Sequence, residues 1–308
     1  MDKSLLIQQI KMSIYKEFWE FRKSIVGVPL VVGAIFLAVF IFEMFTLNQY
    51  QQTRMVSSIE QINAEGMQAS VTQMSLASVF GTFLVISFFI QAYYALSCLY
   101  DERRDKSVFF WRSMPVSDGQ TIGVKLLMAA LLIPAVSIMI ASILSIVAML
   151  VMSIIGLISS NFNVSDIWSL FVGGHTLSSF LSAGYGLILY ALWLFPLIAW
   201  LMLASAYAKK SPFLIAVIPL VLLSITEVLL SLVFSYQTWE IATKIATYLS
   251  ITPDSRDVFM VLDSHRASSI MPINFFIEVL HHRISLFALL IGSAFIFASY
   301  WVRKNSVR

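Results

Sequence analysis

Residues able to catalyse a reaction or to bind a metal ion are sparse in this chain. Glu278, His281 and His282 form the pattern E-x-x-H-H, and Glu-x-x-His occurs as one half of di-metal carboxylate sites. A working di-metal site needs a second such half with further carboxylates, and the sequence contains no matching segment. Adjacent histidines also point to different faces of a helix. We therefore interpret these residues as a polar group at a membrane surface.

Two patterns typical of enzymes are also weak or missing. Ser182 lies in the small-residue run Ser-Ala-Gly-Tyr-Gly, but no His or Lys base is in register with it, and small residues are common where membrane helices pack closely. The chain lacks G-x-x-x-x-G-K-[ST], the loop whose backbone amides hold ATP phosphates, and it lacks the metalloprotease motif H-E-x-x-H. The sequence therefore predicts a protein that is not an enzyme and has no cofactor or metal of its own.

Glu227 is a carboxylate well inside a long apolar run, LLSITEVLLSLVF. An ionisable group at the centre of a bilayer costs about 3 kcal/mol or more unless it is paired, protonated or facing water. Two interpretations stay open: a residue that lines a transport pathway or subunit interface, and a protonated side chain that bonds a neighbouring helix. Gln91, in an earlier apolar run, is a weaker case of the same kind.

The segment Leu99 to Asp118, LYDERRDKSVFFWRSMPVSD, combines charge with aromatic surface. Residues 101–106 are all charged, although charged residues make up only 12% of the chain. Large apolar residues follow at once, and aromatic anchors beside a charged rim are typical of a protein contact. We expect a compact helix that binds a partner rather than a loop that only fixes topology. The residues assigned to this interface are Glu102, Arg103, Arg104, Asp105, Val108, Phe109, Phe110, Trp111, Met114 and Pro115.

Composition identifies the kind of fold that positions these residues. Hydrophobic residues make up 59% of the chain, whereas soluble domains are about 45–50% apolar and about 25% charged. A chain this apolar cannot cover a water-facing surface, so the sequence predicts an all-α integral membrane protein that forms a single domain, 1–308. Six runs approach or exceed the roughly 20 residues that a spanning helix needs: 25–47, 76–99, 124–157, 178–207, 213–235 and 284–302.

Three local signals refine these spans. Ser117 and Gln120 match a capping box that opens the third span. Pro134 and Pro196 are expected kink sites, because proline removes a backbone donor. Pro212 follows Ser211, as a first-turn proline follows an N-cap residue at the start of a helix.

The distribution of Lys and Arg predicts the orientation. Fifteen of the 20 basic residues fall in the N-terminal arm, the second-to-third connection, the fourth-to-fifth connection and the C-terminal end. The positive-inside rule places these segments, and with them both termini, in the cytoplasm. Residues 48–75 and 236–283 then lie outside, and INFFIEVL within the second of these is too short to span.

The first 23 residues predict an interfacial helix. Apolar residues recur at steps of three and four along it, with lysines largely elsewhere, so one face can lie in the headgroup layer near anionic lipid. A simple basic anchor is the alternative interpretation. The apolar stripe consists of Ile7, Ile10, Ile14, Phe18 and Phe21.

Taken together, these features resemble the permease subunits of ATP-binding-cassette exporters of the ABC-2 type. The segment reads L-Y-x-E-R-R-D-x-S-x-x-F-W-x-S-x-P-V-S-D, which is very similar to one group of bacterial members. Six spans, internal termini and the amphipathic arm extend the resemblance over nearly the whole chain. The matching residues are Leu99, Tyr100, Glu102, Arg103, Arg104, Asp105, Ser107, Phe110, Trp111, Ser113, Pro115, Val116, Ser117 and Asp118.

The resemblance implies a permease in the bacterial cytoplasmic (inner) membrane, driven by separate cytosolic ATPase subunits. Two ATPases would bind ATP and Mg²⁺, and two permease chains, identical or related, would form the substrate pathway. The segment 100–119 would be the coupling loop that docks on an ATPase, residues 1–23 the elbow helix, and Glu227 would lie near the dimer interface. Membrane lipids are expected partners and nucleic acid is not.

Two other functions remain open at this stage. A secondary transporter or channel would use Glu227 for proton or ion coupling and would need no ATPase. A membrane adaptor would bind an ATPase without transporting anything. The first leaves the aromatic loop unexplained, and only a flux measurement separates the second from a permease.

Overall fold

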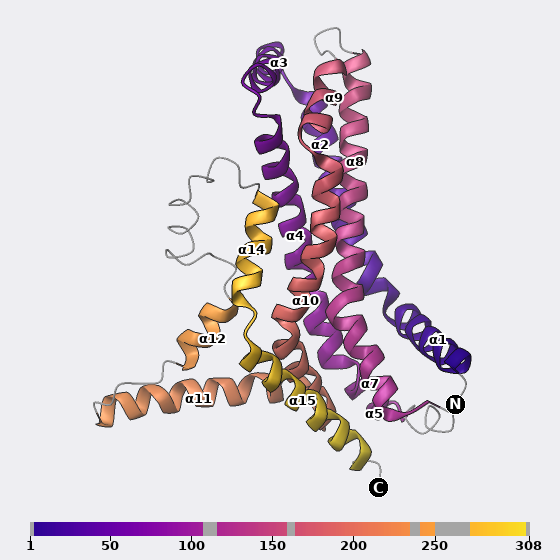
Figure 1. The fold of residues 1–308 in the computed structure, drawn as a ribbon, viewed down its shortest axis with the longest axis vertical. Coiled ribbons are helices and arrows are strands. Elements are labelled where there is room, and N and C mark those ends of the chain that lie inside the picture. The colour runs from indigo at the N-terminus through magenta and orange to yellow at the C-terminus, as the bar shows by residue number, and fades with distance from the viewer. Residues whose placement is uncertain (1–2, 107–115, 159–163, 235–240, 250–271, 306–308) are drawn as a thin grey trace.

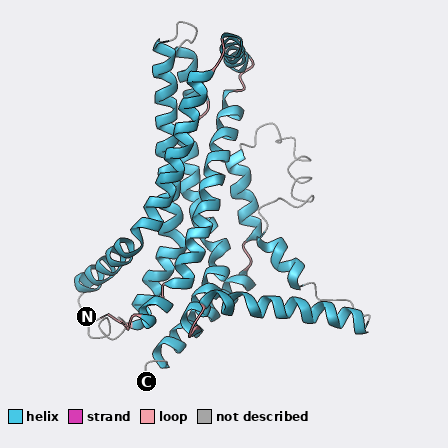
Figure 2. Ribbon diagram, turned by 180° about the vertical axis from the view of Figure 1, so that it is seen from behind, coloured by secondary structure: helices cyan, strands magenta, loops and turns pink. Residues whose placement is uncertain are grey.

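The computed structural model describes residues 3–106, 116–158, 164–234, 241–249 and 272–305. Within these ranges the chain is helical and forms no strand (Figures 1 and 2), which confirms the all-α prediction. The helices are α1 (Lys3–Arg22), η1 (Lys23–Gly27), α2 (Val28–Thr46), α3 (Gln49–Ala64), α4 (Gln68–Ser97), α5 (Tyr100–Arg104), α7 (Asp118–Leu127), η2 (Met128–Leu132), α8 (Ile133–Ile158), α9 (Val164–Gly173), α10 (Thr176–Tyr207), α11 (Pro212–Phe234), α12 (Ile241–Leu249), α14 (Pro272–Arg283) and α15 (Leu286–Asn305).

Six helical stretches are long and apolar enough to cross a membrane, so the chain is a multi-pass membrane protein. Each overlaps one of the six predicted spans. The helix α4 begins earlier than the predicted span, at Gln68, whereas α7 begins at Asp118, as the capping box of Ser117 and Gln120 predicts. The short helix α9 was not predicted. The six stretches are Ile7–Thr46, Gln68–Arg104, Asp118–Leu157, Val164–Tyr207, Pro212–Leu232 and Leu286–Asn305.

An elongated bundle of α2, α4, α8 and α10 forms the body of the molecule (Figure 1). Its core gathers around the inner faces of α4, η2 and α10, where Tyr94, Met128 and Leu194 are almost fully buried. At one end, α1, α11 and α15 spread away from the bundle, and both chain termini lie at this end (Figure 1). The helix α3 lies at the opposite end. We call the end that holds the termini the base.

The helix α11 lies across the bundle axis, not along it, and the view from behind shows the same arrangement (Figure 2). Its start is fixed by the chain itself: Ala208 is extended (ψ 131°), Pro212 opens the helix as predicted, and Trp200 Nε1 donates to Ala216 O at 3.1 Å. Most of its large apolar side chains are exposed. Such a helix is suited to contact with lipid or another chain. The location of residues 236–283 outside the membrane, on the side opposite the termini, stays a prediction.

Two π-helical segments, η1 and η2, interrupt the first and third long stretches, and each ends shortly before a proline. Pro29 and Pro134 both occupy the second position of the helix that follows. Because proline has no N–H, the ordinary bond to the carbonyl four residues earlier cannot form, and a wider turn accommodates the break. The helix is thus irregular just before Pro134, where a kink was predicted, and also just before Pro29, where none was predicted. Pro196 lies inside α10, which continues past it.

Close packing at the base depends on a glycine. A Cβ on Gly292 of α15 would lie 2.6 Å from Phe195 Cε1 of α10, closer than side chains allow. The two helices therefore cross directly at this point. This contact fixes α15 against α10 and brings the C-terminal turn of α15 towards α5 and α7.

Candidate functional site

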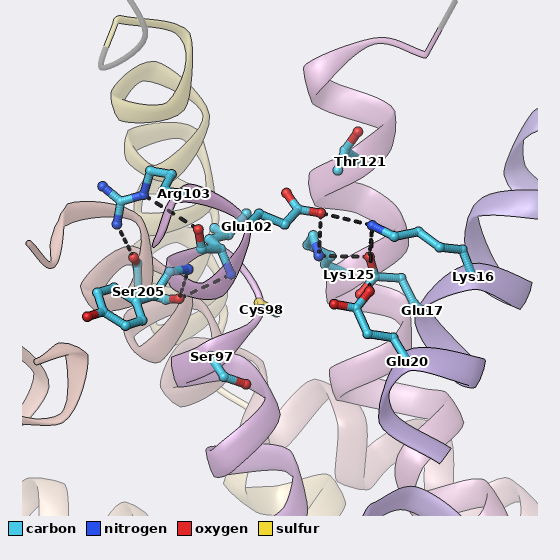
Figure 3. Close-up of polar contacts among 12 residues, drawn as sticks. Lys16, Glu17, Glu20, Ser97, Cys98, Glu102, Arg103, Thr121, Lys125 and Ser205 are labelled. Atoms are coloured by element: carbon cyan, nitrogen blue, oxygen red, sulfur yellow. Dashed lines mark hydrogen bonds and ion pairs between the residues drawn. The ribbon is translucent and has the colours of Figure 1, made fainter. Parts of the chain in front are cut away.

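A buried group of charged side chains joins the helices at the base. Lys125 of α7 lies between two carboxylates: its Nζ is 2.8 Å from Glu17 Oε1 of α1 and 3.1 Å from Glu102 Oε1 of α5 (Figure 3). The three side chains are at most 4% exposed. Segments far apart in the sequence are thus joined through one ammonium group.

The second oxygen of Glu102 extends this group to the C-terminal helix. Arg303 Nη1 of α15 donates to Glu102 Oε2 at 2.9 Å, and Arg303 Nε donates to Asp118 Oδ1 at 2.9 Å. Asp118 is the first residue of α7. Arg303 therefore bridges the two helices that flank residues 107–115.

Two further contacts attach α1. Lys16 Nζ lies 3.2 Å from Glu102 Oε1, and the Tyr94 hydroxyl of α4 donates to Glu17 Oε2 at 2.8 Å. The ring of Tyr94 also packs edge-on against Phe21, with centroids 4.9 Å apart. The predicted elbow helix is thus held to the inner helices by its charges as well as by apolar contact.

We call this group the base network and define it by its three cations and three carboxylates: Lys16, Lys125, Arg303, Glu17, Glu102 and Asp118. A further carboxylate, Glu20, has a side chain that is 45% exposed and lies 3.7 Å from Lys16 at the edge of this group. Burying a charge costs several kcal/mol, which only close pairing and hydrogen bonding offset, and removal of one partner leaves an uncompensated charge. A paired network of this kind favours one relative arrangement of its helices.

Sequence reasoning missed most of this network, although a local signal was present. Glu17 lies three residues after Ile14 and four before Phe21, on the apolar stripe of α1, so its position already indicated a buried carboxylate. Lys125 lies likewise between Ile122 and Met128, three residues from each. Arg303 carries no such signal, because C-terminal basic residues usually mark an aqueous end.

The predicted interface residues divide into two kinds. Glu102 is 4% exposed and Arg103 half-buried, and both bind other helices of this chain. Arg104 and Asp105 are exposed and pair with each other, Arg104 Nε to Asp105 Oδ1 at 3.0 Å. The other predicted members, Val108, Phe109, Phe110, Trp111, Met114 and Pro115, lie outside the described residues.

The two predicted intramembrane polar residues lie on different helices. Gln91 of α4 is buried; its Nε2 donates to Ala129 O at 2.7 Å, and its Oε1 accepts from the Tyr190 hydroxyl at 3.0 Å. Gln91 therefore joins α4 to η2 and α10. Glu227 is half-buried on α11.

Arg103 fastens the end of α10 to α5. Its Nη2 donates to Ser205 O at 2.6 Å and Ala208 O at 2.9 Å, while Ser205 Oγ accepts from the backbone N–H groups of Leu99 and Tyr100 (Figure 3). The Tyr100 hydroxyl donates to Lys210 O. The bond to Ser205 O satisfies one of the last carbonyls of α10, which have no partner within the helix, and the bonds to Ala208 O and Lys210 O hold the chain that follows it.

Replacing Arg103 with alanine is expected to lower the free energy of unfolding by about 2 kcal/mol, because a charged donor is lost and helix-end carbonyls are left unsatisfied. Arg104→Ala is the matched control. Its side chain is 57% exposed, and its loss is expected to change stability by less than about 0.5 kcal/mol. Thermal unfolding of both variants in detergent checks this, and equal losses would contradict the assigned role of Arg103.

The described residues form no group of three or more His, Cys, Asp or Glu side chains arranged to hold a metal ion. His282 Nδ1 lies 3.0 Å from Glu278 O of its own helix, α14.

The capping box predicted at the start of α7 is confirmed, since Gln120 N donates to Ser117 Oγ and Ser117 N to Gln120 Oε1.

Comparison with known proteins adds no relative to this picture. No family model, no curated protein and no solved structure matches the chain.

Proposed function

We propose that this chain is the membrane permease subunit of an ATP-binding-cassette exporter and is driven by separate cytosolic ATPases. The observation that carries the proposal is the position of the segment Leu99 to Asp118. Its charged start, α5, and its capped end, α7, both lie at the base, together with the two termini (Figure 1). Its sequence has the charged and aromatic composition of a docking segment.

The base network supports this proposal by joining the two helices that flank the segment. Glu102 of α5 and Lys125 of α7, on either side of residues 107–115, pair with Nζ and Oε1 3.1 Å apart, and Arg303 bonds both Glu102 and Asp118. A force applied to residues 107–115 would therefore move α4–α5 and α7–α8 as a unit, with α1 and α15 attached. The π-helical segments η1 and η2 follow the network members Glu17 and Lys125 along the chain and lead from α1 and α7 into the long apolar helices α2 and α8.

The electrostatics of the base agree with a cytoplasmic location. The four segments richest in Lys and Arg are the N-terminal arm, the α5–α7 connection, the α10–α11 connection and the C-terminal turn of α15. The Tyr100–Lys210 and Arg303–Glu102 bonds bring the last three together. By the positive-inside rule this end faces the cytoplasm, where ATPases that bind ATP and Mg²⁺ and a second permease chain would complete the exporter.

The experiment starts from the reading frames beside this gene. We expect one of them to encode a Walker A-bearing ATPase without membrane segments, which is then co-expressed with this chain. We expect the two to co-purify in detergent and the chain to stimulate ATP hydrolysis after reconstitution in liposomes. A chain that catalyses proton-coupled transport in liposomes without any ATPase would be a secondary transporter and would contradict the proposal. Binding of an ATPase with no ATP-dependent transport would identify an adaptor instead.

A further inference from the structure

An apolar cavity of about 140 Å³ lies between α4, α8, α10 and α14. The short helix α14 lies alongside α4 and α10 and covers one side of it (Figure 1). The other walls belong to three of the helical stretches that are long and apolar enough to cross a membrane. The cavity is separate from the base network, with which it shares no residue.

Small residues at helical spacing create this space. On α4, Ala77, Gly81 and Leu84 follow one another at steps of four and three and therefore share a face. On α10, Gly186 lets α14 approach so closely that a Cβ there would lie 3.3 Å from Ile277 Cγ1. A Cβ on Gly81, in contrast, would meet no atom within 4 Å, so this wall of the cavity is open.

The described lining offers a ligand no free polar side chain. Among these lining residues only Tyr190 has a polar side chain, and its hydroxyl is engaged with Gln91 Oε1 at 3.0 Å and Leu84 O at 3.4 Å. A ligand with polar groups would lose its hydrogen bonds to water on entry without replacement. The chemistry of the cavity therefore selects hydrocarbon.

We propose that this cavity binds the end of an acyl chain of a bilayer phospholipid. Its volume is close to that of an engineered cavity of about 150 Å³ that takes benzene, so it accepts about five or six carbon atoms. Gly81 is exposed and lies within the apolar run of α4, so the cavity opens sideways at a depth where phospholipid chains surround the protein. This inference is independent of the proposed exporter function.

Photolabelling tests the proposal directly. The protein is reconstituted in nanodiscs made with a phosphatidylcholine that carries a diazirine near the end of one acyl chain, and labelled peptides are identified by mass spectrometry. We expect preferential labelling of the wall segments 77–84 and 183–190. Gly81→Leu fills most of the cavity and is expected to reduce this labelling roughly tenfold, and Gly81→Ala is expected to reduce it by less.

Gly184→Leu is the matched control. Gly184 lies on α10 and does not line the cavity, and a Cβ at this position would meet no atom within 4 Å, so its substitution should leave labelling unchanged. Equal labelling of the wild type and Gly81→Leu, with both variants monodisperse in size-exclusion chromatography, would overturn the proposal. Labelling by a free photoreactive alkane but not by the phospholipid would also overturn it, because the occupant would then be another apolar molecule.

Discussion

Replacing Lys125 with methionine is expected to lower the free energy of unfolding by about 3–5 kcal/mol. Methionine keeps much of the apolar stem but removes the ammonium group that lies 2.8 Å from Glu17 and 3.1 Å from Glu102. Two buried carboxylates then lose a shared partner, and an uncompensated buried charge is one of the most destabilising single changes in a protein. Equilibrium unfolding in mixed micelles measures the loss.

The double variant Glu17→Gln/Lys125→Met separates charge balance from packing. With both residues neutral, the remaining members are two cations and two carboxylates, so we expect the double variant to be more stable than Lys125→Met alone. Lys304→Met, an exposed neighbour of Arg303, is the control and should change stability by less than about 0.5 kcal/mol. If Lys125→Met changed the free energy of unfolding as little as that control does, the base network would not stabilise the fold.

If the proposed function holds, truncation of the aromatic pair Phe110 and Trp111 to alanine is expected to uncouple the chain from the proposed ATPase partner. Aromatic anchors at the centre of a protein contact each contribute about 2 kcal/mol or more, which corresponds to roughly thirty-fold in affinity. The loss should appear as failure to co-purify and as loss of stimulated ATP hydrolysis, while the stability of the isolated permease stays unchanged. The last point distinguishes a docking role from a folding role.

Phe45→Ala provides the matched aromatic control for this experiment. Phe45 is 76% exposed near the end of α2 that leads into α3, and α3 lies at the end of the molecule opposite the base (Figure 1). Its truncation should leave ATPase binding intact. Unchanged co-purification and stimulation by the Phe110/Trp111 variant would remove the main support for the docking segment.

The presence of a helix could be predicted from the sequence wherever a single local pattern, such as a long apolar run or a capping pair, was strong. Long apolar runs identified the six stretches that are long and apolar enough to cross a membrane, and the pairing of Ser117 with Gln120 placed the start of α7 at its observed position. These features are local, so the sequence contains them directly. The start of α4 was placed too late because polar residues from Gln68 onwards continue the same helix beyond the apolar run.

The candidate site was harder to predict because its members meet only after folding. Glu17, Glu102 and Arg303 come from three distant segments, and no spacing rule relates them. Glu102 was assigned to a binding surface on the strength of its charged neighbours, whereas the structure places its carboxylate between Lys125 and Arg303. The direction of α11 depends in the same way on tertiary contacts, notably the bond from Trp200 to Ala216, which hydropathy does not encode.

Site-specific crosslinking from position 110 tests the central claim most directly. A photoreactive amino acid replaces Phe110, the chain is co-expressed with the neighbouring ATPase, and intact cells are irradiated. We predict a covalent adduct between the permease and the ATPase, formed from position 110 but not from position 45. Absence of that adduct, together with modification of position 110 by a membrane-impermeant reagent added outside the cells, would contradict the account.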